Sequence, residues 1–321
     1  MRPTEIFSRE EMARLTARSD TMGAWGVLST WAIIAGAFAL LARWTSVVTW
    51  AIVLVVLGGR QLALAVLMHE GAHRTLFRTR WLNDVVADVV CARPIWGDVR
   101  KYRAHHLGHH RKTGRADDPD LSLVTPFPTT RASLVRRFVR DLLGMTGWKL
   151  VAARLLMDAQ ILEYTVAHEV RRLPRRAWHV HARALLRSVA PPILANAVLF
   201  AILAATGHAW VFLAWPLAYL TTFALFVRIR SMAEHACTAR SPDIFANTRT
   251  TRAGWLARAT VAPLAVNFHL EHHLLVAVPW FRLAHLHRLL QARGLVAPSP
   301  GYLDVLRLVS SRGQNRPLNP A

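Results

Sequence analysis

The sequence predicts an all-α integral membrane protein with four transmembrane helices in two hairpins and a cytosolic helical cap that holds a histidine-rich di-metal site. Two observations support this fold class. Hydrophobic residues make up 53% of the 321-residue chain, and they concentrate in four runs that each approach the ~20 residues needed to cross a bilayer. Histidines gather in three short boxes that lie between and after those runs.

The four apolar runs form two pairs with short connectors. Residues 25–42 and 47–68 make the first pair, and residues 189–206 and 210–227 make the second. Tryptophans lie near the ends of these runs, as interfacial aromatic residues often do. Burial of the four runs inside a soluble protein is the alternative, but runs of this length with such short connectors are hard to bury in that way.

Basic residues orient the predicted hairpins. The net charge is +21; residues 69–188 hold 22 Lys/Arg against 11 Asp/Glu, and residues 228–321 hold 12 against 4. The short connectors hold one arginine, Arg43. The positive-inside tendency therefore places the N-terminus, the central segment and the C-terminal segment on the cytoplasmic side. Anionic lipid headgroups account for this basicity, and no nucleic-acid-binding motif is present, so nucleic acid is not an expected partner.

We expect a single membrane domain. Its predicted parts are a cytosolic N-terminal segment (1–24), the first hairpin (25–68), cap residues with two boxes (69–188), the second hairpin (189–227), cap residues with the third box (228–297) and a tail (298–321). Within the cap, residues 81–96 predict an interfacial or re-entrant segment, and residues 131–187 an amphipathic helical layer on the membrane. The tail contains many prolines and glycines, which predicts that it adds no core element.

Three histidine boxes carry the chemistry. Box one is His69 and His73, box two is His106, His109 and His110, and box three is His269, His272 and His273. Residues at i, i+3 and i+4 share a helix face, so each box is expected to project its imidazoles toward one point. Eight rings exceed the needs of one tetrahedral zinc, and imidazole binds iron, copper, nickel and zinc well. The boxes therefore predict two metal ions.

Carboxylates near the boxes are candidates to fix the orientation of the rings. These candidates are Glu70, Glu234, Glu271, Asp98, Asp118 and Asp120. His105 breaks the box spacing, and its role stays open. Three further histidines lack box spacing and are expected to be surface or packing residues: His168, His179 and His181.

Arg60 lies inside the second predicted span, about 13 Å along the helix from His69. An arginine at membrane depth is costly and usually faces a bundle interior. Arg60 therefore either borders a substrate passage, as a candidate substrate-binding residue, or holds a buried partner. The third alternative is a helix shifted in register, from which Arg60 reaches the interface.

The boxes and their flanks resemble the membrane fatty acid desaturase superfamily, and in particular its bacterial acyl-lipid branch. The resemblance covers roughly residues 25–295 and rests on three correctly spaced boxes divided by two hairpins. Flanking residues agree as well: Tyr102-Arg103, Asp118-Pro119-Asp120, Ala233-Glu234-His235-Ala236, Asn267-Phe268, Val278-Pro279 and Leu286-His287.

The resemblance implies a mushroom-shaped fold in a bacterial inner membrane, with two non-haem irons on the cytoplasmic side. It implies the eight box histidines as ligands, joined by His235. In acyl-CoA desaturases of the superfamily an asparagine one turn earlier helps to hold a metal through water; Ser231 stands there in this sequence, and its role stays open. The implied activity is reductive activation of O2, followed by hydrogen abstraction from a lipid or fatty acyl chain.

Three functions remain as alternatives. Desaturation of an acyl chain is the leading one. A hydroxylase or ketolase acting on a fatty acyl chain, carotenoid or other long lipid is the second, because the outcome depends on ångström-level geometry. The third is a non-catalytic membrane metal-binding protein, for which the spans offer few polar residues beyond Arg60, Gln61 and Asn196.

The chain contains no obvious source of electrons. It lacks a His-Pro-Gly-Gly haem motif and a Gly-x-Gly-x-x-Gly motif, and Cys91 and Cys237 are too few to hold an iron–sulfur cluster. We therefore expect an external electron donor of ferredoxin or cytochrome type. Its acidic surface would dock on the arginine-rich cap.

Overall fold

The computed structural model describes residues 2–167 and 170–312. In these ranges the chain is helical apart from loops and three isolated β-bridges. The all-α class predicted from the sequence is confirmed.

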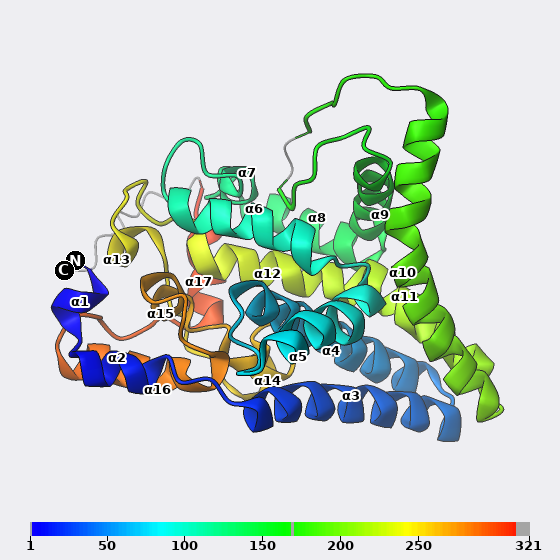
Figure 1. The fold of residues 1–321 in the computed structure, drawn as a ribbon, viewed down its shortest axis with the longest axis horizontal. Helices are drawn as coiled ribbons and strands as arrows, with labels where there is room; N and C mark the ends of the chain where they lie inside the picture. Colours follow the sequence, from blue (N-terminus) through cyan, green and yellow to red (C-terminus); the bar gives the residue numbers. More distant parts are fainter. Residues whose placement is uncertain (1, 168–169, 313–321) are drawn as a thin grey trace.

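Four helices are long and apolar enough to cross a membrane, which confirms the predicted number of spans. They are Arg9–Arg43, whose main part is α3 (Asp20–Arg43), then α4 (Val47–His73), α10 (Trp178–Ala205) and Ala209–His235. The fourth is a composite of η3 (Ala209–Leu213), α11 (Ala214–Ala218), the π-helix η4 (Tyr219–Phe223) and α12 (Ala224–His235). In Figure 1, α3 runs along the lower edge and α10 rises along the right-hand side.

Serine caps define the first hairpin. Ser19 accepts a hydrogen bond from the Met22 N–H at the start of α3, and Ser46 accepts one from the Thr49 N–H at the start of α4. Such caps satisfy backbone donors that have no partner within the helix. The helix α4 continues beyond the predicted span as far as His73, so box one forms its last turn.

Helix α10 differs from the prediction at its start. It begins at Trp178 rather than near residue 189, and it runs without a break through Pro191 and Pro192. Proline removes a backbone donor and leaves carbonyls of the preceding turn without partners. The Asn196 side-chain amide donates to the carbonyl of Pro192 (2.9 Å) and to that of Pro94 (3.2 Å). The bond to Pro94 ties α10 to the segment that precedes box two.

Shorter helices build the cap. They are α1 (Pro3–Ile6), α2 (Arg9–Leu15), α5 (Arg80–Val85), the π-helix η1 (Val86–Ala92), η2 (Arg93–Ile95), α6 (Val99–Lys112), α7 (Leu121–Val124), α8 (Arg131–Leu142), α9 (Met145–Asp158), α13 (Ile244–Asn247), α14 (Trp255–Ala259), η5 (Pro263–Ala265), α15 (His269–Leu274), α16 (Trp280–Ala292) and α17 (Tyr302–Val309). The helical layer predicted for residues 131–187 is therefore interrupted by a loop: α9 ends at Asp158, and the chain is helical again from Trp178, where α10 begins.

The C-terminal tail contributes to the core, contrary to the prediction. In α17, Val305 and Val309 are almost fully buried and pack in one cluster with Met232 and Ala233 of α12. The breaking residues lie before and after this helix, and none lies within it. The Gly301 N–H donates to the side chain of Asp304 (3.0 Å), which stabilises the first turn.

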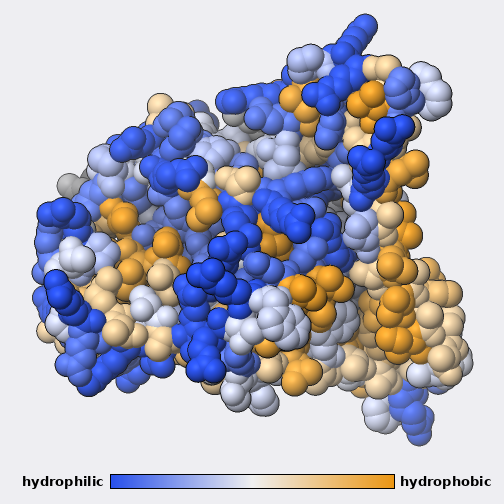
Figure 2. All heavy atoms as spheres, viewed as in Figure 1, coloured by the Kyte–Doolittle hydropathy of each residue, from blue (hydrophilic) through white to orange (hydrophobic). Residues whose placement is uncertain are grey.

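The surface separates into an apolar and a polar region. Figure 2 shows hydrophobic residues gathered at the lower right, over the lower half of α10, and hydrophilic residues over the left and upper parts. Apolar side chains of α10 that point outward include Ile193, Leu194, Val198, Phe200 and Ile202. An apolar surface of this kind suits contact with lipid.

Close packing between α4 and η1 sets the position of box one, and we expect it to depend on Gly71. A Cβ at Gly71 would overlap with the Cβ of Ala87, whereas a Cβ at Gly36 in α3 would meet no atom within 4 Å. Gly71→Ala should therefore lower stability by ~1–3 kcal/mol, a typical cost of overpacking. Gly36→Ala should be neutral or stabilising by up to ~1 kcal/mol. Melting followed by tryptophan fluorescence in detergent measures both; equal melting temperatures would contradict the prediction.

Candidate metal centre

Four helices bring the box histidines to one place. Box one lies in the last turns of α4, box two on α6, and box three on α15, while His235 is the last residue of α12. Nine histidines converge there in two groups whose candidate ligand atoms lie within 4.8 Å of one another.

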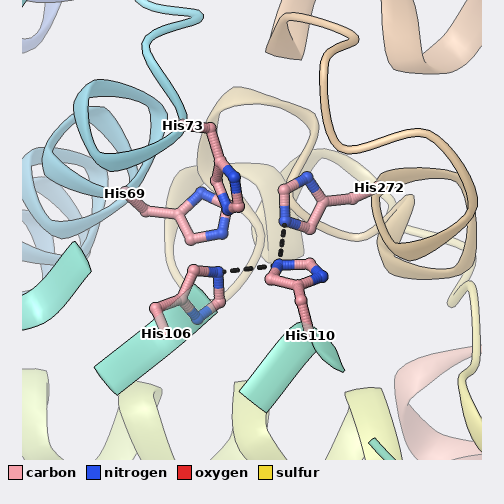
Figure 3. Close-up of side chains that lie close together, drawn as sticks. All are labelled: His69, His73, His106, His110 and His272. Carbon is pink, nitrogen blue, oxygen red and sulfur yellow. Dashed lines mark hydrogen bonds between the residues drawn. The ribbon is translucent and has the colours of Figure 1, made fainter. Parts of the chain in front are cut away.

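The first group combines all three boxes. It consists of His69, His73, His106, His110 and His272, which Figure 3 shows pointing toward one another. The Nε2 atom of His110 lies 2.9 Å from that of His106 and 3.0 Å from that of His272. The second group consists of His109, His235, His269 and His273. In it, the Nε2 atom of His269 lies 2.9 Å from that of His235 and 3.1 Å from that of His273.

The expectation that each box projects its rings toward one point was wrong for boxes two and three. His106 and His110 enter the first group and His109 the second, while box three is divided between His272 and the pair His269 and His273. At about 100° per residue, position i+4 is turned by about 40° from position i and position i+3 by about 60° in the opposite direction. In these boxes the i, i+4 pairs share a group, and the i+3 histidine turns to the other one. Box one, which is an i, i+4 pair, stays together.

The two groups fit metal ions. Two nitrogens bound at right angles to one metal, each at ~2.1 Å, would lie about 3 Å apart, as the closest Nε2 pairs do. Both ring nitrogens of His69 and the Nε2 atom of His73 are buried without a hydrogen-bond partner. Buried polar atoms of this kind are costly unless something binds them. A metal ion at the first group would bind a nitrogen of each of these two rings.

Burial also keeps most of these rings in the form that binds metals. It lowers the pKa of five of them far below the ordinary histidine value, and the neighbouring histidines lower it further. The five are His106, His110, His269, His272 and His273. They are therefore neutral at pH 7, with a lone pair available for a metal.

His109 differs because it contacts carboxylates. Burial alone would lower its pKa, but the hydrogen bond with Asp118 and the charges of Asp120 and Asp118 outweigh this effect and raise the pKa. The Nδ1 atom of His109 lies 2.8 Å from Asp118, which leaves Nε2 for the metal. This arrangement fixes the ring orientation.

Two other candidate carboxylates, Glu234 and Glu70, lie near rings of the two groups. Glu234 lies 3.4 Å from the Nδ1 atom of His269, close enough to influence that ring. Glu70 lies 3.8 Å from His69, and its carboxylate accepts hydrogen bonds from the Thr75 hydroxyl (2.8 Å) and the Trp280 N–H (3.0 Å).

Two candidates contact no ring of either group. Glu271 bonds to His287 (2.6 Å) and Thr250, and Asp98 caps α6 and pairs with Arg93 (3.1 Å). Asp120 lies 2.7 Å from His105 and 3.7 Å from the Nδ1 atom of His109.

Three described histidines outside the boxes also lie outside the two groups, namely His105, His179 and His181. His105 bonds to Asp120, and the Nδ1 atom of His181 lies 2.8 Å from the carbonyl of Ala159. His179 is exposed, as predicted. His168 lies outside the described residues.

Arg60 contacts backbone carbonyls of exposed residues, so it does not hold the buried partner that was one of the alternatives predicted for it. Its guanidinium donates to the carbonyl of Ala259 (2.9 Å) and more weakly to that of Arg258 (3.4 Å). These carbonyls end α14, whose chain leads on to box three. A cavity borders the histidine groups, and Arg60 is not among the described residues that line it.

A cavity of about 300 Å³ borders both histidine groups. His106 lines it from the first group, and three members of the second do so: His109, His235 and His269. The remaining wall is largely apolar and includes Leu62 and Met68 of α4, Phe223 of η4 and Val227 of α12. Ser231 also faces this cavity, so its position lies beside the second group. The π-helix η4 in this wall is of a kind that often occurs at functional sites.

Several residues at the site carried no motif of their own. The backbone carbonyl of Asn247 lies 3.1 Å from the Nδ1 atom of His235, a contact that any residue type could make. The ring of Tyr102 stacks on His106 at 5.0 Å; the sequence pointed to it only through the flank of box two. Arg154 and Tyr164, which line the cavity, gave no signal.

Comparison with known proteins identifies the family. Residues 45–299 match the fatty acid desaturase family. The chain belongs to this family. It is therefore a desaturase-family enzyme of the membrane di-iron oxidoreductase class, and its buried histidine groups are consistent with a desaturase di-iron site.

Its curated relatives are distant desaturases. The chain is 26% identical to dihydrorhizobitoxine desaturase of Bradyrhizobium elkanii, over 93% of this chain and 82% of that protein. It is 24% identical to an sn-1 oleoyl-lipid 12-desaturase of Anabaena variabilis and 26% identical to one of Synechocystis sp.. Each of these two matches covers 68% of this chain and 62% of the relative's length, less than two thirds of it.

We expect Asp118 to control metal retention. Asp118→Ala removes the group that orients His109, and such a loss weakens metal binding by about 10–100-fold. Asp117→Ala is the matched control, because the Asp117 side chain is 63% exposed and pairs with Lys112. Iron retained during titration with a chelator measures the effect. Equal retention by the two variants would show that Asp118 does not act through His109.

Proposed function

We propose that the protein is an O2-dependent desaturase of a lipid or fatty acyl chain, with a di-iron centre held by nine histidines. The ligands would be His69, His73, His106, His110 and His272 at one iron and His109, His235, His269 and His273 at the other. The observation that carries the proposal is the convergence of these rings in two buried groups beside an apolar cavity, in a chain of the desaturase family.

The protein's own residues would prepare the site for this reaction. The irons, when bound, would supply the reductive activation of O2 that oxidises an unactivated C–H bond. The imidazoles would hold them, and Asp118 fixes the ring of His109. The apolar wall, including Met68 and Phe223, would exclude water and hold the chain near the histidines, where positioning decides the rate.

Desaturation is favoured over the alternatives by the relatives, all three of which are named as desaturases. A non-catalytic metal protein does not agree with membership of an enzyme family. Two relatives are named for oleoyl-lipid and one for dihydrorhizobitoxine, so their names leave several substrates open to this chain. The size and the charges of the cavity would select among these substrates.

We also propose that the histidine groups face the cytoplasm, in the inner membrane of a bacterium. The support is the excess of Lys/Arg in residues 69–188 and 228–321 over the short connectors. An external ferredoxin or cytochrome would deliver electrons to the basic cap. Electron transfer that does not change with salt concentration would count against this docking.

Expression in a heterologous host tests the proposed function. Lipids analysed by mass spectrometry should gain a double bond, with a mass loss of two hydrogens, and the purified protein should contain two irons per chain. His272→Ala should abolish the product, because it removes one ligand of the first group, while membrane insertion remains. His179→Ala, at an exposed position, is the control and should keep full activity.

Other outcomes would change the proposal. A product that gains one oxygen atom would identify a hydroxylase. One zinc per chain with no new product would exclude an oxidative enzyme. Full activity of His272→Ala would refute the ligand assignment.

A further inference from the structure

Arg154 is a basic residue in the wall of the cavity beside the histidine groups. Helix α9 presents Thr146, Leu150 and Arg154 to the cavity, spaced i, i+4 and i+8 on one helix face. The guanidinium carbon of Arg154 lies 5.1 Å from the centre of the Tyr164 ring. That ring in turn lies 6.2 Å from His105, next to box two. Arg154 is therefore on the side of the cavity nearest box two.

Two other arginines of the cavity wall are matched one to one by carboxylates. Arg228 binds Asp141 through two hydrogen bonds, one of them 2.8 Å long. Arg230 donates to Glu234 (2.6 Å). Each forms an ion pair whose charges offset each other.

Arg154, in contrast, shares its carboxylate with a second cation. Asp158 accepts from the Lys101 ammonium (2.7 Å) and from the Nε of Arg154 (3.3 Å). The carboxylate of Asp98 is paired with Arg93 instead. Within salt-bridge distance, two positive charges therefore face one negative charge. Because the Asp158 side chain is only 4% exposed, water screens this excess poorly.

The guanidinium of Arg154 also has donors to spare. It carries five N–H groups in a fork that matches a carboxylate, and its hydrogen bond to Asp158 uses the Nε. Although the side chain lines the cavity, only 21% of it is exposed. An anionic group that enters the cavity would meet it out of contact with bulk water, where a charge-assisted bond is strong.

We propose that Arg154 binds the carboxylate of a free, unesterified acid whose chain lies along the apolar wall of the cavity. This assignment rests on the proposed function, and it names the substrate class. A cavity of about 300 Å³ is at the lower end of the ~300–1,000 Å³ range of ligand pockets. It suits one short or medium chain, whereas a diacyl lipid brings a second chain and a headgroup. A lipid phosphate is the other anion that could reach an arginine.

Binding measured by calorimetry on the metal-loaded, full-length protein in neutral detergent tests the assignment without requiring turnover. Decanoate is compared with its uncharged methyl ester and with dihexanoyl phosphatidylglycerol. The wild-type protein should bind decanoate at least about tenfold more tightly than the ester, as expected for one charge-assisted pair. Phosphatidylglycerol should bind no more tightly than the ester.

Variants then locate the carboxylate. Arg154→Gln should lose the preference for acid over ester and leave ester binding unchanged; Lys101 still pairs with Asp158 in this variant. Arg154→Lys keeps the charge without the fork and should retain part of the preference. Arg136→Gln removes an exposed arginine of α8 and should change nothing. Gel filtration and iron content check folding.

The assignment is overturned by equal affinity of the wild-type protein for acid and ester. It is also overturned if the preference survives in Arg154→Gln, because the carboxylate would then bind elsewhere, the irons included. Phosphatidylglycerol binding that depends on Arg154, without such dependence for decanoate, would identify a lipid phosphate site. A protein that binds decanoate as predicted but forms no oxidised product would keep the assignment and refute the proposed function.

Discussion

The structure depends on the cost of burying nine imidazoles side by side. His69 and His73 have ring nitrogens that are buried and unpartnered, and burial keeps most of the other rings neutral. No protein atom bonds to these nitrogens, and a bound metal would offset the cost. Since the rings come from α4, α6, α12 and α15, a metal bound there would also tie distant parts of the chain together. Metal binding would then contribute to the free energy of folding.

Arginine side chains donate hydrogen bonds to backbone carbonyls at helix ends near the histidines. Arg103 of α6 donates to the carbonyls of Ala72 and Gly71 at the end of α4 (both 2.9 Å), which joins box two to box one. Arg60 does the same for the end of α14, and Arg249 donates to the carbonyl of Ala236 after α12 (2.8 Å). Cations at helix C-termini complement the free carbonyls and the helix dipole. Part of the large positive charge is therefore structural, and it is not available to lipid or to an electron donor.

The residues that line the cavity would determine which substrate the protein accepts. Its wall is apolar along α4 and η4. It is charged along α12, which adds Arg228, Arg230 and Glu234, and where α9 and box two meet. The same helix that exposes Trp148 at the surface presents the largely buried side chain of Arg154 to the cavity. One helix thus contributes both to the surface expected to face the membrane and to the substrate cavity.

The sequence by itself determined the features that depend on local spacing: four apolar runs of spanning length and three boxes with i, i+3 or i+4 histidines. It could not determine which rings fall into the same group: His109 and His110 are neighbours in the chain, yet they point about 100° apart and enter different groups. Nor could it reveal α17 in the core, or the pairing of Asp158 with Lys101 and Arg154 across two helices. Only the tertiary structure decided these, since each depends on contacts between segments far apart in the sequence.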